Sequence, residues 1–288
     1  MSQVPRVFHD PSELRSEVRR AQARGQRAGL VPTMGALHEG HLSLVAESQK
    51  TCDLTVVTIF VNPTQFAPGE DFEKYPRTLD TDLKLLSRFE PVWVLAPEVE
   101  AMYPSGSTTE VNAPEIARTL EGEFRPTHFD GVATIVLKLF QVAPADAAYF
   151  GQKDFQQVRV IEEMVRDLLV PIEIIRCPII REEDGLAMSS RNRYLSEGER
   201  KIALVISQTL RASVAQIEAG ATDGNLLSGE MLALMQEAGI APEYVTIADP
   251  QTLKSVETIT AEVVILVAAK VGATRLIDNV LVSPPSSR

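Results

Sequence analysis

Short apolar runs alternate with segments of helical periodicity along the N-terminal part of the chain. The runs cover residues 29–31, 54–61, 92–96, 147–150 and 172–175. Each has the length and composition of a buried strand. Between them, apolar residues recur at the spacing of a helix face, as they do over residues 132–139. Strands separated by helices predict a parallel sheet with helices on its faces, so we expect a Rossmann-like, doubly wound α/β domain over residues 1–187.

The pattern is different in the C-terminal part of the chain. Ser196 and Glu199 have the spacing of a capping box, which predicts a helix through residue 219. A second helix is expected over residues 225–238. Strand-like runs then follow without intervening helices, at residues 244–247, 263–269 and 276–282. This order predicts a smaller α+β domain over residues 188–288.

Composition and charge narrow the classes of function. The 288 residues are 44% hydrophobic and 23% charged, which is typical of a globular protein with enough chain for two modest domains. No apolar run approaches the roughly 20 residues of a membrane helix, and the N-terminus lacks a basic segment followed by an apolar one. A cytoplasmic protein with no membrane partner is therefore expected. The net charge of −11 would repel a polyanion, so no nucleic-acid partner is expected.

The two cysteines, Cys52 and Cys177, lie far apart in the sequence and lack the paired spacing of a zinc or redox motif. We therefore expect two structural thiols in a reducing compartment and no stabilising disulfide.

Four clusters of polar residues follow predicted strands, and the first covers residues 32–41. Its two glycines allow a tight turn before a helix, whose free amides could bind a phosphate. The imidazoles of His38 and His41 could stabilise charge that develops on phosphorus. Zinc ligation and an ordinary polar loop are the alternatives. Zinc is disfavoured because the chain has only four histidines and this pair lacks the helical protease spacing, so no metal site is expected.

The second cluster, residues 60–66, places neutral amides beside an aromatic ring, which suits a small polar acid. Gln65 could donate to a carboxylate or hydroxyl oxygen. Asn62 could orient a phosphate or could form an Asx turn before Pro63, and the sequence leaves both open.

The third cluster, residues 150–157, leaves a predicted strand and begins a helix. Lys153 could neutralise phosphate oxygens, Asp154 could cap the helix, and Gln157 would lie about one turn further along. The fourth cluster runs from Ile180 to Arg191, next to the expected domain boundary. Its serine hydroxyls and guanidinium could bind a departing pyrophosphate.

All parallel strands of a doubly wound sheet end at the same edge, and ligands bind in the crevice beyond it. The four clusters are therefore expected to converge there. No carboxylate pair and no serine-histidine-acid order competes with them as a catalytic centre.

With residues 75–78, 125–129 and 274–279, these clusters resemble the pantothenate synthetase (pantoate–β-alanine ligase) family over nearly the whole chain. Residues 38–41 resemble the His-x-Gly-His signature of the nucleotidylyltransferase superfamily. Residues 188–191 resemble its second, Lys-Met-Ser-Lys-Ser type signature. Ala187 stands where that pattern has its first lysine, which leaves Lys153 as the expected cation.

The resemblance implies that ATP activates pantoate as an adenylate, which β-alanine then converts to pantothenate with release of AMP. It implies Mg²⁺ on the nucleotide, a homodimer, a lid role for the C-terminal domain, and His41, His38 and Lys153 as catalytic residues. Pantoate would be held by Gln65 and Gln157, with Asn62 beside them. The residues implied for ATP binding are Met34, Gly35, Ala36, Leu37, His38, Glu39, Gly40, His41, Gly151, Gln152, Lys153, Asp154, Ile180, Met188, Ser189, Ser190 and Arg191.

Asp82 could lie near magnesium or could be a solvated acid on a helix. The sequence leaves both open, so Asp82 is given no role. Two rival enzymes share the expected fold: a tRNA synthetase core, which would need a basic RNA-binding region, and a phosphopantetheine adenylyltransferase, which would be shorter. A rival from another class is a silent nucleotide-binding regulator.

Overall fold

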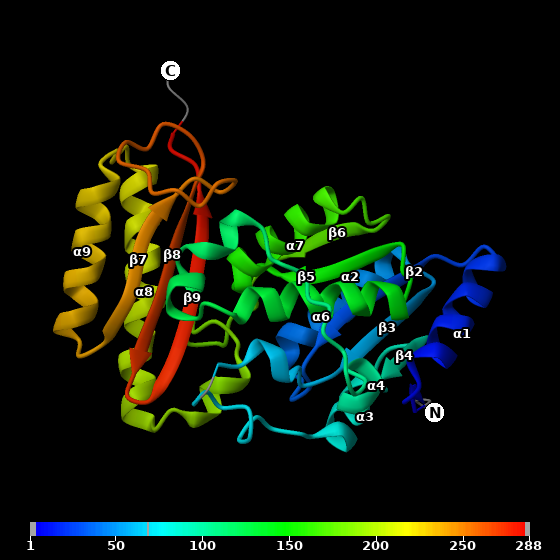
Figure 1. Cartoon of the computed structure of the whole chain (residues 1–288). Coiled ribbons are helices and arrows are strands. Elements are labelled where there is room, and N and C mark those ends of the chain that lie inside the picture. The colour runs from blue at the N-terminus through cyan, green and yellow to red at the C-terminus, as the bar shows by residue number, and fades with distance from the viewer. Residues whose placement is uncertain (1–3, 68, 286–288) are drawn as a thin grey trace. The chain divides into compact units, whose positions relative to one another are not determined.

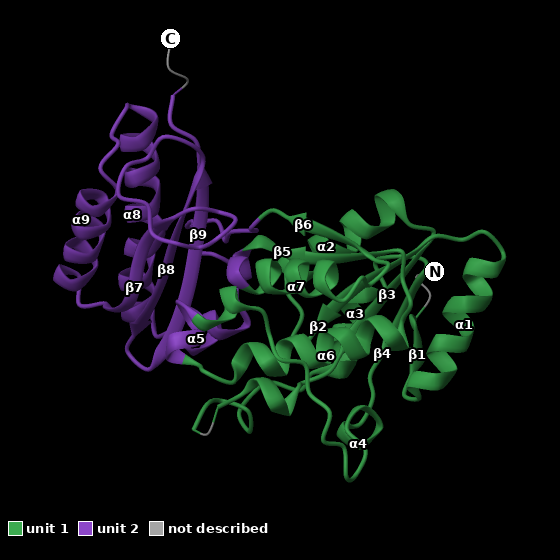
Figure 2. Ribbon diagram, turned by 45° about the horizontal axis from the view of Figure 1, so that its top comes forward, with its two compact units in different colours: residues 1–118, 125–152, 157–178 green, residues 119–124, 153–156, 179–288 purple. Residues whose placement is uncertain are grey.

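The computed structural model describes residues 4–67 and 69–285, and the chain divides into two compact units (Figure 2). Unit 1 comprises the chain up to Arg118 together with residues 125–152 and 157–178. Unit 2 comprises residues 119–124 and 153–156 and the chain from Ile179 onward. Unit 2 thus takes two short segments, residues 119–124 and 153–156, from the part of the chain before residue 179.

Unit 1 is built on a six-stranded parallel sheet (Figure 1). Its strands are β1 (Arg6–Phe8), β2 (Ala28–Thr33), β3 (Leu54–Ile59), β4 (Val92–Leu95), β5 (Ala147–Gly151) and β6 (Glu173–Cys177), in the order β1-β4-β3-β2-β5-β6. Five of them lie at the predicted runs. β1 was missed because three residues are too few to give a strand pattern. From β2 the chain adds β3 and β4 on one side, and it then adds β5 and β6 on the other side of β2. The direction in which strands are added therefore reverses between β2 and β5, although all six strands are parallel.

Helices cover this sheet. They are α1 (Pro11–Ala23), α2 (Glu39–Thr51), α3 (Leu79–Leu86), α4 (Val99–Met102), α6 (His128–Val142) and α7 (Phe155–Asp167), whose first turn is grouped with unit 2. Short 3₁₀ turns lie at η1 (Pro63–Gln65), η2 (Glu115–Arg118) and η3 (Gln152–Asp154). The sequence did carry a signal for α1, because Asp10 caps it and Pro11 occupies its first turn. Leu42 and Val45 of α2 share a buried cluster with Val31 and Val57 of the sheet.

Unit 2 contains a three-stranded antiparallel sheet in the order β7-β8-β9, with α8 and α9 packed against it (Figure 1). Its elements are η4 (Ser190–Tyr194), α8 (Glu197–Glu218), α9 (Gly224–Glu237), β7 (Ala241–Ala248), β8 (Val263–Val271) and β9 (Thr274–Val282). Ser196 and Glu199 form the capping box that the sequence predicted at the start of α8. The α/β fold class with a smaller α+β part is thereby confirmed.

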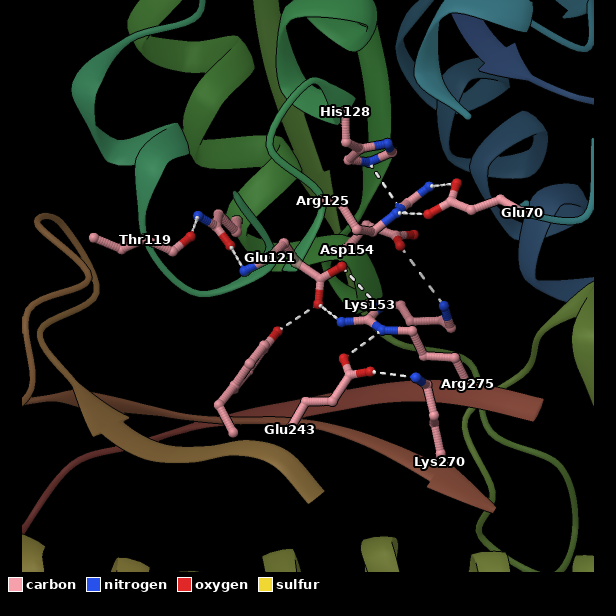
Figure 3. Close-up of polar contacts among 12 residues, drawn as sticks. Glu70, Thr119, Glu121, Arg125, His128, Lys153, Asp154, Glu243, Lys270 and Arg275 are labelled. Carbon is pink, nitrogen blue, oxygen red and sulfur yellow. Dashed lines mark hydrogen bonds and ion pairs between the residues drawn. The ribbon is translucent and has the colours of Figure 1, made fainter. Parts of the chain in front are cut away.

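The short helix α5 (Glu121–Phe124) belongs to unit 2 through a buried ionic network (Figure 3). The Arg275 guanidinium donates to both carboxylate oxygens of Glu121, at 2.6 and 2.8 Å. Its Nε donates to Glu243 at 2.7 Å, and the Tyr244 hydroxyl donates to Glu121 at 2.7 Å. Burial, with the neighbouring Glu121 carboxylate, raises the pKa of Tyr244, so the phenol stays protonated. These bonds satisfy the charge of Glu121, which is buried at 6% exposure.

No helix in the described ranges has both the length and the apolar composition that a membrane crossing needs.

Candidate active site

The turn between β2 and α2 is held by a buried carboxylate from α3. Gly35 and Ala36 adopt positive φ angles of 81° and 50°, and the second is unfavourable for a residue with a side chain. Asp82 compensates: its Oδ2 accepts the Ala36 amide at 3.0 Å and its Oδ1 accepts the Leu37 amide at 2.9 Å. Asp82 is 1% exposed, so its interpretation as a solvated acid is wrong. The carboxylate instead fixes the backbone path into α2.

His38 and His41 form a reciprocal cap at the start of α2. Nδ1 of His38 accepts the Gly40 amide at 3.1 Å, and Nδ1 of His41 accepts the His38 amide at 3.4 Å. Because each Nδ1 accepts a backbone N–H, the proton of each neutral ring is on Nε2. The ring centroids lie 4.1 Å apart. The helix start therefore has two imidazole N–H donors whose orientation is fixed by the backbone, beside the positive end of the helix dipole.

Asn62 has all four of its side-chain hydrogen-bonding positions occupied by protein. Its Nδ2 donates to Gln65 Oε1 at 3.1 Å and to the Gly131 carbonyl at 3.2 Å. Its Oδ1 accepts from Thr64 at 3.1 Å and from Tyr103 at 2.7 Å. The side chain is thus a structural centre of the turn before Gln65. It does not form the Asx turn that the sequence left open, because its Oδ1 accepts side-chain hydroxyls and no backbone amide of η1.

Gln65 is oriented by the same network. Its Oε1 accepts from Asn62 and its Nε2 lies 3.3 Å from Met34 Sδ. The amide is therefore held beside Met34, the residue that follows β2, which brings the first and second sequence clusters together.

The Gln65 backbone is held by two side chains with no role predicted from the sequence, Arg125 and His128. Figure 3 shows both of them beside Glu70. Arg125 and His128 both bond to the Gln65 carbonyl oxygen, at 3.1 and 2.8 Å. Arg125 also forms a two-bond fork with Glu70, at 2.6 and 2.7 Å. Burial opposes ionisation of Glu70, but the hydrogen bond and charge of Arg125 outweigh it and lower the pKa of that carboxyl. The only sequence signal for this pair was its position in the family-like segment 125–129.

Gly131 permits close packing of α6 against the Gln65 turn. A Cβ at this position would lie 2.3 Å from the Thr64 carbonyl oxygen and 2.9 Å from the Gln65 backbone nitrogen. Only glycine fits without moving the turn.

The third cluster is shared between the units. Gly151 ends β5, Gln152 lies in η3 and the half-buried Gln157 lies in α7, all in unit 1. Lys153 and Asp154 belong to unit 2, where Nζ of the lysine lies 3.7 Å from Oδ1 of the aspartate. The lysine side chain is 20% exposed and the aspartate side chain 47%.

The fourth cluster begins with a tight hairpin in unit 2. The Met188 amide donates to the Ile180 carbonyl at 2.9 Å, and Arg181 and Ala187 form an antiparallel bridge. The Ser189 side chain then caps η4 by accepting the Arg191 amide at 3.2 Å. Ser190 and Arg191, which start η4, are half-buried. The Ser-Ser-Arg segment therefore lies directly after the hairpin and forms the capped start of η4.

Within the described residues, no three histidine, cysteine, aspartate or glutamate side chains gather as a metal centre would require. The candidate residues are instead amides and imidazoles in unit 1 and hydroxyls and cations in unit 2, groups that can bind anions and stabilise negative charge in a transition state. A helix start that follows a strand beside the reversal of strand order in a parallel sheet is typical of α/β enzymes that act on phosphate-bearing ligands.

Comparison with known proteins identifies the family. The model of the pantoate-beta-alanine ligase family matches residues 6–281, so the chain belongs to this family. A pantothenate synthetase of Acidobacterium capsulatum is 54% identical over 254 residues, which are 88% of this chain and 85% of the relative. One of Acetivibrio thermocellus is 50% identical over 278 residues, or 96% of this chain and 99% of the relative.

Solved structures agree. A pantothenate synthetase of Thermus thermophilus superposes with a TM-score of 0.88 at 40% identity, covering 96% of this chain and 98% of that one. A pantoate-beta-alanine ligase of Francisella tularensis, solved with Beta-gamma ATP and β-alanine, has a TM-score of 0.80 at 33% identity and covers 96% and 97% of the two chains. The resemblance drawn from the motifs is confirmed, and the expected enzyme class, a pantothenate-forming ligase, is confirmed with it.

Proposed function

We propose that the enzyme uses ATP to activate pantoate as pantoyl adenylate and then transfers the pantoyl group to β-alanine. In the first step a pantoate carboxylate oxygen attacks the α-phosphorus, and the bond to the β-phosphate oxygen breaks to release pyrophosphate. In the second, the β-alanine nitrogen attacks the acyl carbon, the bond to AMP breaks and the amine loses a proton. The observation that carries the proposal is the capped start of α2, where His38 and His41 each accept a backbone amide through Nδ1. Their Nε2–H groups and the backbone amides at the helix start would stabilise the negative charge that develops on the α-phosphorus.

His41 and His38 are the proposed catalytic residues of the first step. Each has an Nε2–H outside the capping bond in this geometry, so each can stabilise the negative charge on the pentacoordinate phosphorus by hydrogen bonding. A general-acid role for His41 would require its imidazolium form. The Asp82 carboxylate supports them indirectly by holding the Ala36 and Leu37 amides. No covalent enzyme nucleophile is required, because positioning and electrostatic stabilisation suffice for both steps.

Gln65 and Gln157 are proposed to hold pantoate, and Gln65 also to meet β-alanine. Neutral amides hold a carboxylate by hydrogen bonds without neutralising it, which leaves its oxygen nucleophilic. Asn62 acts in this proposal by orienting Gln65, since its own donors and acceptors are occupied.

The remaining residues are proposed to bind ATP as the family resemblance implies. Lys153 would neutralise phosphate oxygens, and the Ser189, Ser190 and Arg191 segment would stabilise the pyrophosphate as it leaves. Gly151, Gln152, Asp154, Ile180 and Met188 complete the proposed set beside residues 34–41.

Mg²⁺ is proposed to arrive with ATP as the counter-ion of the triphosphate. The described residues contain no acidic cluster that would hold it alone. Both Asp82 oxygens are engaged by backbone amides and by Thr78, so Asp82 suits a supporting role better than that of a metal ligand. The ion would add positive charge at the phosphates. The resemblance also supports two further proposals, a homodimer and a lid role for the C-terminal domain. A cytoplasmic location and the division into domains 1–187 and 188–288 remain proposals from the composition and the sequence pattern.

Pyrophosphate exchange tests the proposal directly. With ATP and pantoate but no β-alanine, the protein should exchange labelled pyrophosphate into ATP, and addition of β-alanine should then yield AMP and pantothenate. ATP binding without exchange would favour the silent nucleotide-binding regulator. A panel of hydroxy acids and amines in a pyrophosphate-release assay tests the choice of substrates.

A further inference from the structure

Strand β9 of unit 2 contains two adjacent buried polar residues that the ligase reaction as proposed above does not use. Asp278 and Asn279 are 4% and 3% exposed. Buried polar side chains lower stability unless they are hydrogen-bonded, so their partners indicate what they do. Both partners lie in segments assigned to ATP binding.

Asn279 is bonded to the backbone of Lys153. Its Nδ2 donates to the Lys153 carbonyl oxygen at 2.9 Å, across 126 positions of sequence. Arg275, four residues earlier on the same face of β9, holds Glu121 of the other inserted segment. This face of β9 therefore fixes both short segments that unit 2 takes from the chain before residue 179.

Asp278 is bonded to the hairpin that leads to Met188. Arg181 donates to its two carboxylate oxygens, at 2.7 and 2.9 Å, in a fork. The same guanidinium donates to the Gly185 carbonyl at 3.1 Å and so closes the hairpin. Because adjacent strand residues point to opposite faces, β9 can hold the lysine segment with one side chain and the hairpin with the next.

We propose that Asn279 is a positioning residue for Lys153 in the adenylation step, and that Asp278 has the same role for the segment Met188–Arg191. The inference rests on the proposed role of Lys153. The lysine lies in a three-residue 3₁₀ turn, where few backbone bonds fix its position, so a tether on its carbonyl restricts where the ammonium group can reach. Asn279 does not touch substrate in this proposal and acts only through the backbone.

The test uses Asn279→Asp and Asn279→Ala in the full-length enzyme, with pyrophosphate exchange as the readout. Asn279→Asp keeps the shape but turns the donor into an acceptor that faces the Lys153 carbonyl. We expect kcat for exchange to fall about 10- to 100-fold, with the KM for pantoate unchanged. Arg275→Lys is the matched control, because it weakens a tether on the same face of β9 that holds the other segment, and it should leave exchange within about 2-fold.

Combination with Lys153→Ala separates positioning from general weakening. If Asn279 acts through the lysine, adding Asn279→Asp to Lys153→Ala should reduce exchange by less than about 2-fold. Multiplying effects, or equal losses in Arg275→Lys, would overturn the inference. A wild-type protein without exchange would instead remove the proposed function. Wild-type exchange that Lys153→Ala does not lower would overturn the inference and leave the ligase function standing.

Discussion

The α2 turn of unit 1 and the two β9-supported segments of unit 2 are held in place by different means. In unit 1 the groups proposed to bind a ligand are backbone amides and imidazoles at a helix start, and one carboxylate, Asp82, holds the turn through two backbone amides. In unit 2 the groups are side chains on short segments, tied to a distant strand through Asn279 and Asp278. The first arrangement positions donors by helix geometry, whereas the second depends on single side-chain bonds.

This difference predicts how each region responds to substitution. A helix start keeps its backbone donors when a side chain is lost, so damage should be limited to the missing group. A tethered turn loses its position when one bond is lost, so a residue that never touches substrate can reduce turnover. Four substitutions in unit 1 test this difference, together with the Asn279 variants in unit 2.

The largest expected effect follows loss of His41. His41→Ala should lower pyrophosphate exchange by about 10²- to 10⁴-fold, because the proposed donor to the reacting phosphate is gone. The melting temperature should change little, since the capping bond from the side chain to the His38 amide is long, at 3.4 Å. His9→Ala, at an exposed histidine outside the site, is the control and should leave exchange unchanged. An unfolded His41→Ala protein would make the residue structural.

A bulkier residue at Gly131 should displace Gln65. In Gly131→Ala the new Cβ would meet the Thr64 carbonyl at 2.3 Å, so the turn must move. We expect the KM for pantoate to rise about 10-fold or more, and the free energy of unfolding to fall by about 1–3 kcal/mol. Gly198→Ala, where a Cβ meets nothing within 4 Å, is the control for steady-state kinetics. An unchanged KM would separate Gln65 from pantoate binding.

Asp82→Asn tests whether one carboxylate holds the α2 turn. The amide keeps the shape but turns one acceptor into a donor that faces a backbone N–H. Unfolding free energy should fall by about 1–3 kcal/mol, and exchange by about 10-fold. Asp80→Asn, at an exposed position of the same helix, should change neither. Full exchange in Asp82→Asn would show that the helix alone fixes the turn.

The smallest expected effect is the pH dependence of the Glu70–Arg125 fork. The pKa of Glu70 lies below its ordinary value of 4.5, so the fork stabilises the fold above that pH, and this contribution is lost as pH falls through the lowered pKa. Glu70→Gln should therefore cost about 0.5–1 kcal/mol at pH 7 and progressively less below pH 4.5. Chemical denaturation across this range measures the effect. Glu13→Gln, in an exposed pair with Arg6, should show almost none; an equal loss there would assign the effect to net charge.

Much of the fold follows from local pattern. Strands β2 to β9 and the capped helix α8 were predicted, because period and capping chemistry are properties of neighbouring residues. β1 was not predicted because it is short. α1 was not predicted, although Asp10 and Pro11 mark its start. The clusters at 32–41 and 60–66 were also visible in the sequence, since each follows a strand directly.

What the sequence determined by itself was the order of elements, the family motifs and the residue types at the ends of the strands. Only the tertiary structure decided that Asp82 is buried under the α2 turn, that Asn62 is fully occupied, and that residues 119–124 and 153–156 pack with β7 and β9. The reason is the separation of the partners along the chain. Periodicity and caps depend on residues within about four positions of one another. The bonds of Asp82 to the α2 turn and of the two inserted segments to β7 and β9 join residues 45 to 154 positions apart, and two bonds of Asn62 join residues 41 and 69 positions apart, so these pairings exist only once the chain has folded.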